Sequence, residues 1–215
     1  MNINIMAGGP IEHLPNLQTY LNDNSFWVGV DRGVYQLLKR DIKPMIAFGD
    51  FDSVNPVELK EIEKSVKELK RFKPEKDETD LDLALQWAIN QSPDSIKVFG
   101  ATGGRLDHLF GNVQLLIHAA IVYDFVEIEI IDRQNHLFVK GSGCYQIKKI
   151  PDKKYISFVP ATENISNLTL DGFKYPLKNH HISIGSTLCI SNELISDYGT
   201  FSFSEGILIV IRSHD

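Results

Sequence analysis

Over residues 1–132, short apolar runs alternate with longer segments in which apolar residues recur at helical spacing. The apolar runs predict strands at Ile3–Met6, Phe26–Val30, Met45–Phe48, Ser95–Phe99 and Val126–Ile131, and a further short one at Glu68–Phe72. The segments between them predict helices at His13–Leu21, Gly33–Arg40, Pro56–Lys64, Thr79–Asn90 and Leu106–Tyr123. Such alternation is typical of an α/β domain built on a parallel sheet.

Beyond Asp132 the pattern changes to short β-rich runs separated by turn residues. These runs predict strands at His136–Val139, Cys144–Ile147, Tyr155–Val159, Ile165–Leu170, Thr187–Ile190, Thr200–Phe203 and Ile207–Ile211. The turns between them are predicted at Lys140–Gly143, Asp171-Gly172, Gly185-Ser186 and Glu205-Gly206. We therefore expect an α/β protein with two domains: a Rossmann-like parallel-sheet domain over 1–132 and a smaller antiparallel β-sandwich over 133–215.

Composition indicates the class of protein and its cellular location. The chain has 215 residues, of which 43% are hydrophobic, and only two cysteines, so a buried core is expected and a disulfide framework is not. The N-terminal residues lack the basic head and apolar run of a signal peptide. The apolar stretch 113–122 is too short to span a bilayer. These features predict a cytoplasmic protein.

Charge is distributed unevenly between the two regions. The formal net charge is −6, and residues 1–132 hold 13 basic and 21 acidic residues, whereas the remainder holds nine and seven. Such a balance argues against general nucleic-acid binding, which depends on Lys and Arg. It is compatible with a small phosphate compound that is bound through Mg²⁺ and backbone N–H groups.

Glycines, arginines and aspartates follow four of the predicted parallel strands. The segments are Ala7-Gly8-Gly9, Asp31-Arg32-Gly33, Gly49-Asp50-Phe51-Asp52-Ser53 and Gly100-Ala101-Thr102-Gly103-Gly104-Arg105-Leu106-Asp107. The carboxyl ends of parallel strands share one edge of the sheet, which is where ligands bind in open α/β folds. We therefore expect these segments to form one site.

Two of these aspartates are candidate metal ligands. In extended backbone, alternate residues point the same way, so Asp50 and Asp52 could face one hard cation such as Mg²⁺. An acidic turn is the alternative interpretation of an isolated Asp-x-Asp, because Asp side chains often bond nearby backbone. The position directly after an apolar strand favours the metal site.

The start of the helix predicted at Thr79–Asn90 offers further candidates. Thr79-Asp80-Leu81-Asp82 fits a capping box, which accounts for Asp82 but does not require Asp80. A helix N-terminus also suits anions. Lys76 could reach a phosphate, or it could be a solvated member of a charged run.

The glycine-rich segment before the last helix lacks the Gly-Lys-Ser/Thr ending of a Walker A motif. Small residues there let backbone N–H groups approach a phosphate, and Arg105 adds donors. Asp107 could act as a general base, as a neighbour of the metal or only as a helix N-terminal acid, whereas His108 is interpreted as structural. The pair His180-His181 is expected in a solvated polar loop.

The motifs together resemble the thiamine pyrophosphokinase family. The resemblance is carried by Gly49–Ser53, Lys76–Leu85, Gly103–His108 and Asp31–Gly33, and in the second half by Gly172–Leu177 and Ser191–Leu194. It covers nearly the whole chain, with the motifs in the family's order. Tyr175 stands where animal and fungal members have Trp, and Lys76 stands where they often have Gln.

The resemblance implies an α/β catalytic domain, a C-terminal β-sandwich and a homodimer with active sites between subunits. It implies transfer of the pyrophosphoryl group of ATP to the hydroxyl of thiamine, with Mg²⁺ as cofactor. The residues that it suggests are Asp50, Asp52 and Asp80 for the metal; Asp107, Arg105, Asp31 and Lys76 for catalysis; Gly8, Gly9, Arg32, Thr79, Gly103 and Gly104 for ATP; and Tyr175, Ser191 and Asn192 for thiamine.

Two other functions use the same residues. A Mg²⁺-dependent phosphohydrolase would use water as the acceptor, but it would not need a second domain. A nucleotide-binding sensor would need the glycines but not the Asp-x-Asp. The choice between Asp107 and Asp31 as the group that orients or deprotonates the acceptor hydroxyl stays open at this point.

Overall fold

The computed structural model describes residues 1–22, 24–52, 54–73, 75–123 and 126–215, so Ser53 of the predicted motif lies outside the described residues. The chain divides into two compact units. The first contains Met1–Leu115 and the segment that ends at Arg133; the second contains the residues that follow Leu115 in the last helix, and Gln134–Asp215.

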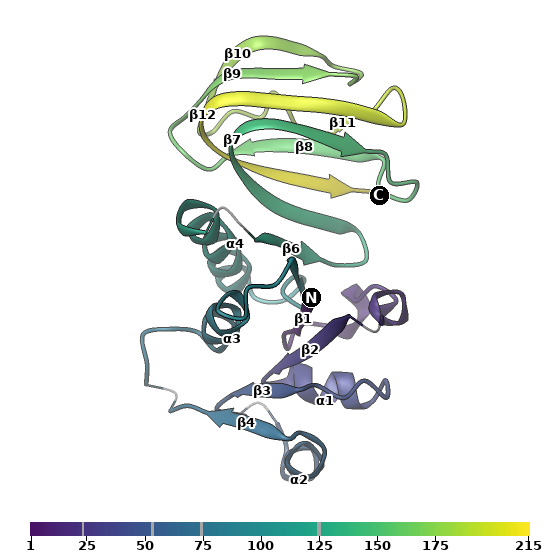
Figure 1. Ribbon diagram of the computed structural model, residues 1–215, viewed down its shortest axis with the longest axis vertical. Helices are drawn as coiled ribbons and strands as arrows, with labels where there is room; N and C mark the ends of the chain where they lie inside the picture. Colours follow the sequence, from purple (N-terminus) through teal and green to yellow (C-terminus); the bar gives the residue numbers. More distant parts are fainter. Residues whose placement is uncertain (23, 53, 74, 124–125) are drawn as a thin grey trace. The chain divides into compact units, whose positions relative to one another are not determined.

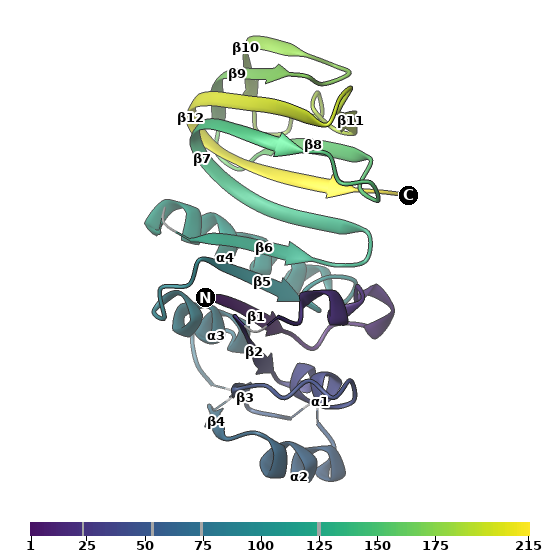
Figure 2. The ribbon, with the colours of Figure 1, turned by 45° about the vertical axis from the view of Figure 1, so that its right-hand side comes forward.

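The first unit is built on a parallel sheet of six strands, all close to their predicted positions. The strands are β1 (Asn2–Met6), β2 (Ser25–Val30), β3 (Ile46–Gly49), β4 (Glu68–Arg71), β5 (Ser95–Phe99) and β6 (Glu127–Ile131). Their order in the sheet is β6-β5-β1-β2-β3-β4, and every neighbouring pair is parallel (Figures 1 and 2). The carboxyl ends of β1, β2, β3 and β5 therefore meet at one edge.

The helices of this unit are α1 (Arg32–Leu38), α2 (Pro56–Ser65), α3 (Asp80–Ile89) and the first part of α4 (Leu106–Val122), which continues into the second unit after Leu115. The prediction of a helix at His13–Leu21 is wrong, because two short 3₁₀ turns occupy this region instead: η1 (Ile11–His13) and η2 (Leu17–Tyr20). Pro15 lies between them. Proline lacks the backbone donor that a continuous helix needs, and it disfavours helical geometry in the residue before it.

Helices cover both faces of the parallel sheet. Successive strand residues point to opposite faces, and on β3 Ala47 belongs to a buried cluster with Val34 of α1, whereas the ring of Phe48 contacts Trp87 of α3. The apolar residues predicted to repeat along α3 are buried: Leu81, Ala84, Leu85, Ala88 and Ile89. Burial on both faces explains why an inner strand such as β3 is a continuous apolar run.

The second unit is antiparallel. Its strands are β7 (Asn135–Lys148), β8 (Tyr155–Pro160), β9 (Asn164–Asp171), β10 (Leu177–Ser183), β11 (Asn192–Glu193) and β12 (Tyr198–Ser213). The long strand β12 pairs with β7 along its length, with β9 in its first part and with β8 in its last part. One core cluster gathers buried side chains from both parts of β12, among them Phe201 and Val210.

Several predicted boundaries in this unit are wrong. The turns expected at Lys140–Gly143 and Glu205-Gly206 lie inside the continuous strands β7 and β12, where the register shifts between Phe203 and Ile207. A glycine within a strand often marks such a bulge rather than a chain reversal. No strand forms at Thr187–Ile190, which is a turn, and the expected polar loop around His180-His181 is strand β10, with both histidines exposed as expected.

The mixed α/β fold with parallel and antiparallel strands is confirmed. Within the described ranges, no helix has the length and apolar character required to cross a membrane.

Candidate active site

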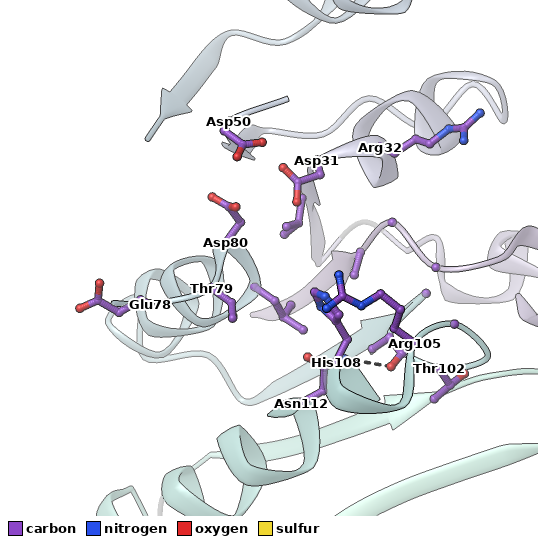
Figure 3. A pocket seen from close by; sticks show the side chains of 18 of the residues that line it. Asp31, Arg32, Asp50, Glu78, Thr79, Asp80, Thr102, Arg105, His108 and Asn112 are labelled. Atoms are coloured by element: carbon purple, nitrogen blue, oxygen red, sulfur yellow. Dashed lines mark hydrogen bonds between the residues drawn. The ribbon is translucent and has the colours of Figure 1, made fainter. Parts of the chain in front are cut away.

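A cavity of about 700 Å³ opens at the carboxyl edge of the parallel sheet (Figure 3). Four of the predicted segments reach it: the turn after β1 with Gly8 and Gly9, the turn after β2 with Asp31 and Arg32, Asp50 after β3, and the glycine-rich turn after β5. The N-terminus of α3 completes the wall with Thr79 and Asp80. The prediction that these segments form one site therefore agrees with the geometry.

Three carboxylates meet in this cavity. One oxygen each of Asp31, Asp50 and Asp80 lies within 4.8 Å of the other two, and all three side chains are half-buried. Figure 3 shows them converging from the ends of β2 and β3 and from the start of α3. The Oδ1 atom of Asp31 is buried and has no hydrogen-bond partner among the described residues. A buried acceptor without a donor is costly, so this cluster is poised for a cation.

Backbone geometry brings the Asp31 carboxylate into the cluster. Asp31 has φ 48° and ψ −125°, a conformation that non-glycine residues rarely adopt. Gly49 makes room for it, because a Cβ at that position would lie 2.1 Å from Asp31 Oδ1. Burial is the largest cause that raises the pKa of Asp31, to about 7. The neighbouring carboxylates add to the rise, and the ammonium group of Lys76 opposes it.

Asp52 does not belong to the cluster. The prediction assumed extended backbone, but Phe51 has φ 60° and its side chain is buried. The backbone N–H of Asp52 donates a 3.0 Å hydrogen bond to Oδ1 of Asp50, and Asp52 itself is exposed. This is the local turn that was the alternative interpretation of the motif. It leaves Asp50 facing the cavity, while Asp52 is still close enough to influence Asp31 electrostatically.

Lys76 and Thr79 both bind to residues in the first turn of α3. The Nζ atom of Lys76 lies 2.6 Å from Oδ1 of Asp80, and both side chains are only 15% exposed. Thr79 is the N-cap residue, and its hydroxyl oxygen accepts a hydrogen bond from the N–H of Asp82. This is one half of the predicted capping box, because the Asp82 carboxylate accepts from Nε2 of Gln86. Both residues line the cavity, so each is placed to contact a bound phosphate.

Arg105 and Asp107 form an exposed ion pair. Nε and Nη2 of Arg105 donate to the two carboxylate oxygens of Asp107. This pairing lowers the pKa of Asp107 to about 2. Arg105 lines the cavity, whereas Asp107 is not among its lining residues. The carboxylate of Asp107 is thus bound to Arg105 and poorly suited to accept a proton.

The glycine-rich turn has two different parts. Gly104 lines the cavity, but Gly103 does not. Gly103 has φ 79°, and a Cβ there would lie 2.1 Å from the ring of His13, so this glycine is required by the turn itself. The prediction that Gly103 contacts ATP finds no support in its position.

Sequence reasoning missed Asn112 and undervalued His108. Both line the cavity, and Nδ2 of the buried Asn112 donates to the carbonyl of Ala101 at 2.9 Å, which fixes the glycine-rich turn (Figure 3). Their spacing of four residues on the apolar helix α4 places two polar side chains on one face. That spacing is the signal that could have found them.

In the second unit, the predicted residues Tyr175, Ser191 and Asn192 belong to two neighbouring segments. Asn192 is only 2% exposed. Its Nδ2 donates to the carbonyl of Tyr175 at 2.8 Å, and its Oδ1 accepts from the N–H groups of Tyr175 and Glu193. Tyr175 itself is 58% exposed. Asn192 therefore holds the Tyr175 backbone, and its side-chain amide has no capacity left on Oδ1.

Ser191 lies at an exposed position with φ 57°. Its backbone N–H donates to the hydroxyl of the buried Ser157 at 2.9 Å. The structure thus brings Tyr175 and Asn192 into direct contact, and Ser191 directly precedes Asn192 in the chain.

The fold and the cavity define a class: an α/β protein whose sheet edge combines clustered carboxylates with glycine-rich turns, as in enzymes that act on phosphate compounds. Residues 17–130 match the family description "Thiamin pyrophosphokinase, catalytic domain", and residues 144–208 match "Thiamin pyrophosphokinase, vitamin B1 binding domain". The chain belongs to the thiamine pyrophosphokinase family.

Individual relatives agree with this assignment. The chain is 54% identical to the thiamine pyrophosphokinase of Bacillus subtilis (strain 168) over 213 residues, which cover 99% of both proteins. Its fold matches the crystal structure of thiamine pyrophosphokinase from Bacillus subtilis with a TM-score of 0.93, 51% identity and full coverage of both chains. It also matches that of Geobacillus thermodenitrificans with a TM-score of 0.92 and 50% identity, covering 100% of this chain and 98% of the other. The resemblance predicted from the motifs is confirmed.

Proposed function

We propose that this chain transfers the pyrophosphoryl group of ATP to the hydroxyl of thiamine, which yields thiamine diphosphate and AMP. The observation that carries the proposal is the cluster of Asp31, Asp50 and Asp80 inside the cavity of a chain that matches the family over its whole length. Transfer of this kind requires mainly positioning and charge stabilisation, both of which clustered carboxylates and backbone N–H groups provide.

In this proposal, each of the two domains binds one of the two substrates. Residues 1–132 form the Rossmann-like domain that binds ATP and the metal, and residues 133–215 form the β-sandwich that binds thiamine. The support is the position of the carboxylate cavity in the first unit and the match of residues 144–208 to the vitamin B1 binding domain.

The carboxylate cluster fits Mg²⁺. Hard carboxylate oxygens are the ligands that this ion prefers, and the unpartnered Oδ1 of Asp31 adds an acceptor that lacks a donor. We assign Asp50 and Asp80 as ligands, in agreement with the sequence, and add Asp31 as the third. Asp52 remains a predicted ligand that lies outside this cluster. Bound Mg²⁺ would neutralise the charge of the polyphosphate.

The remaining polar residues of the cavity position the phosphates. Thr79 and the backbone of Gly8, Gly9 and Gly104 offer hydrogen-bond donors, and Arg105 and Lys76 add positive charge. Asp107 holds the Arg105 guanidinium rather than taking a proton. With Asp31 assigned to the metal, the thiamine hydroxyl is oriented for attack without a strong protein base, which a loose transition state does not require.

At the acceptor end, the exposed ring of Tyr175 offers an aromatic face to the cationic thiamine. Asn192 sets the position of that ring through the Tyr175 backbone, so its role is positioning rather than contact. Ser191 remains a predicted contact. We also propose, from the resemblance, that the protein acts as a homodimer with active sites between subunits, and that it is cytoplasmic.

One assay tests this function against the two alternatives. The protein is incubated with ATP, Mg²⁺ and thiamine, and the products are separated. We expect AMP and thiamine diphosphate in equal amounts, only when thiamine is present. Release of inorganic phosphate without thiamine would instead establish a phosphohydrolase, and the absence of any turnover would leave a nucleotide sensor.

A further inference from the structure

The carboxylate of Asp132 is buried at the sheet edge where the candidate active site lies, and the proposed function gives it no role. Asp132 directly follows β6 and is 6% exposed. Because β6 pairs with β5 and Ile131 lies opposite Phe99, Asp132 and the glycine-rich turn after β5 begin side by side in the first unit. Asp132 is not among the residues that line the cavity, so it can act on the site only through another residue.

Thr102 is the residue through which Asp132 reaches the cavity. Its Oγ1 atom donates a hydrogen bond of 2.7 Å to Oδ2 of Asp132, and Thr102 lines the cavity. A hydroxyl that donates to a carboxylate at this distance forms one of the stronger hydrogen bonds in proteins. The hydroxyl has a single hydrogen, which this bond occupies, so the side chain cannot donate to a phosphate at the same time. The side chain of Thr102 therefore holds the turn rather than a substrate.

Two further hydrogen bonds hold the same turn from other sides. The N–H of Gly9 donates to the carbonyl of Gly100 at 2.8 Å, and Nδ2 of Asn112 donates to the carbonyl of Ala101 at 2.9 Å. A Cβ atom at Gly9 would lie 2.4 Å from the carbonyl oxygen of Gly100, so the turn is already packed closely against the end of β1. Strand β6 lies on the other side of β5 in the sheet, so the bond to Asp132 opposes movement of the turn away from β1.

The turn held in this way has free backbone donors. Within the described ranges, the N–H groups of residues 101–104 donate no hydrogen bond. Successive N–H groups without partners in a turn can bind an anion, provided that the backbone keeps its conformation. The bond between Thr102 and Asp132 therefore affects phosphate binding, although neither side chain donates to the phosphate.

We propose that Asp132 is a positioning residue for the transfer reaction. This inference rests on the proposed function and adds to it a residue outside the cavity. Asp132 fixes Thr102, Thr102 fixes the backbone of residues 101–104, and this backbone positions the phosphates of ATP for attack by the thiamine hydroxyl on the β-phosphorus. A displacement of the phosphates by about 1 Å would lose the alignment on which the transfer depends.

Substitutions at Thr102 test whether its hydroxyl is required. Thr102→Val has nearly the same shape but no hydroxyl, so kcat should fall, the KM for ATP should rise, and kcat/KM for ATP should fall about 30-fold. The KM for thiamine should stay within about twofold of wild type. Thr102→Ser keeps the hydroxyl and should restore kcat/KM to within about threefold of wild type.

Two outcomes of this comparison would overturn the proposal. One is wild-type kinetics in Thr102→Val, with circular dichroism showing that the variant is folded. The other is an equal loss in Thr102→Ser, because packing of the methyl group would then explain the effect.

A double-mutant cycle tests whether Asp132 acts through Thr102. Asp132→Ala should also lower kcat/KM for ATP about 30-fold, and the double variant with Thr102→Val should be no worse than either single variant. If Asp132→Ala does not fold, Asp132→Asn replaces it. Its amide oxygen still accepts from the hydroxyl but carries no charge, so the loss should be about fivefold, and the double variant should be no worse than Thr102→Val alone. Losses that multiply in either cycle would overturn the proposal, because Thr102 would then act independently of Asp132.

Thr19→Val is the matched control. The exposed hydroxyl of Thr19 donates to the carbonyl of Asn16 at 2.8 Å, and Thr19 does not line the cavity. The kinetics of this variant should equal those of wild type. A loss as large as that of Thr102→Val would overturn the proposal, because the position of the hydroxyl would then not matter.

A binding measurement separates the failure of this proposal from the failure of the proposed function. Calorimetry with Mg²⁺ and a non-hydrolysable ATP analogue, without thiamine, should show about tenfold weaker binding to Thr102→Val than to wild type. Wild-type protein that shows this difference but makes no thiamine diphosphate would contradict the function and retain the positioning role of Asp132. Active wild-type protein with no such difference, in binding or in kinetics, would overturn the positioning role alone.

Discussion

The carboxylate cluster of the first unit and the Asn192 amide of the second are both polar groups removed from water, but they are satisfied in opposite ways. Asn192 forms three hydrogen bonds to the backbone, whereas Asp31 keeps a buried oxygen without a partner and faces two further carboxylates. Asn192 therefore stabilises the folded protein, whereas the carboxylate cluster without a bound cation destabilises it.

Whether a buried polar group has its hydrogen-bond partners within the protein indicates where a ligand is expected. A polar group that is fully bonded inside the protein has little to offer a substrate, while a buried acceptor without a donor raises the free energy until a cation arrives. By this criterion, the first unit provides the metal site and Asn192 supports the neighbouring Tyr175.

The largest expected effect comes from breaking the cluster. Asp50→Asn should lower kcat/KM by at least about 10³-fold, because a ligand that faces the cavity is lost. Asp52→Asn should cost only about tenfold, since Asp52 lies outside the cluster. Steady-state kinetics at saturating Mg²⁺ compares the two variants, and circular dichroism checks that both fold. A larger loss for Asp52→Asn would favour the ligand set predicted from the sequence alone.

Removing the satisfied amide should act mainly on stability. Asn192→Ala leaves the N–H and carbonyl of Tyr175 without partners, at a cost of about 2–3 kcal/mol in the free energy of unfolding. The KM for thiamine should rise about tenfold as Tyr175 shifts, with the KM for ATP unchanged. Denaturant unfolding and kinetics measure these quantities.

Asn164→Ala removes one exposed hydrogen bond of the same unit and is the control. A large loss of kcat without loss of stability would indicate direct contact with substrate.

The smallest expected effect is a pH dependence of stability without metal. The pKa of Asp31 is about 7 in the folded protein and about 3.8 when unfolded, so the folded state keeps its proton longer. Its contribution to stability is therefore present below pH 3.8 and is lost as the pH rises to about 7. Asp31→Asn abolishes this titration, and at pH 8 in EDTA the variant should be about 1–2 kcal/mol more stable than wild type.

The difference should shrink as the pH falls toward 4, and added Mg²⁺ should stabilise wild type more than the variant. Chemical unfolding at a series of pH values measures both trends. Equal stability of the two proteins across this range would show that Asp31 is not held in a destabilising environment.

Local sequence signals were sufficient for much of the first unit. The inner parallel strands are short and largely buried, so Ser95–Phe99 and its neighbours β1 and β6 are predictable from apolar runs alone. Their shared edge follows from topology. The long strands β7 and β12 were not predictable in this way, because Gly143 and Gly206 break the local pattern and only pairing across the sheet keeps the strands continuous.

Site geometry was less predictable than site composition. The sequence locates the aspartates but does not show that Phe51 adopts a left-handed conformation, which turns Asp52 out of the cluster. Nor does it show that Gly49 leaves space for Asp31, or that Asn192 is bonded to Tyr175, because these facts depend on contacts between segments.

The position of a bound metal ion tests the central claim most directly. A crystal of the protein soaked with Mn²⁺ and a non-hydrolysable ATP analogue gives an anomalous signal that locates the ion without ambiguity. We predict a peak about 2.0–2.3 Å from carboxylate oxygens of Asp31, Asp50 and Asp80. A peak bound by Asp52 without Asp31, or one outside the cavity, would contradict the account.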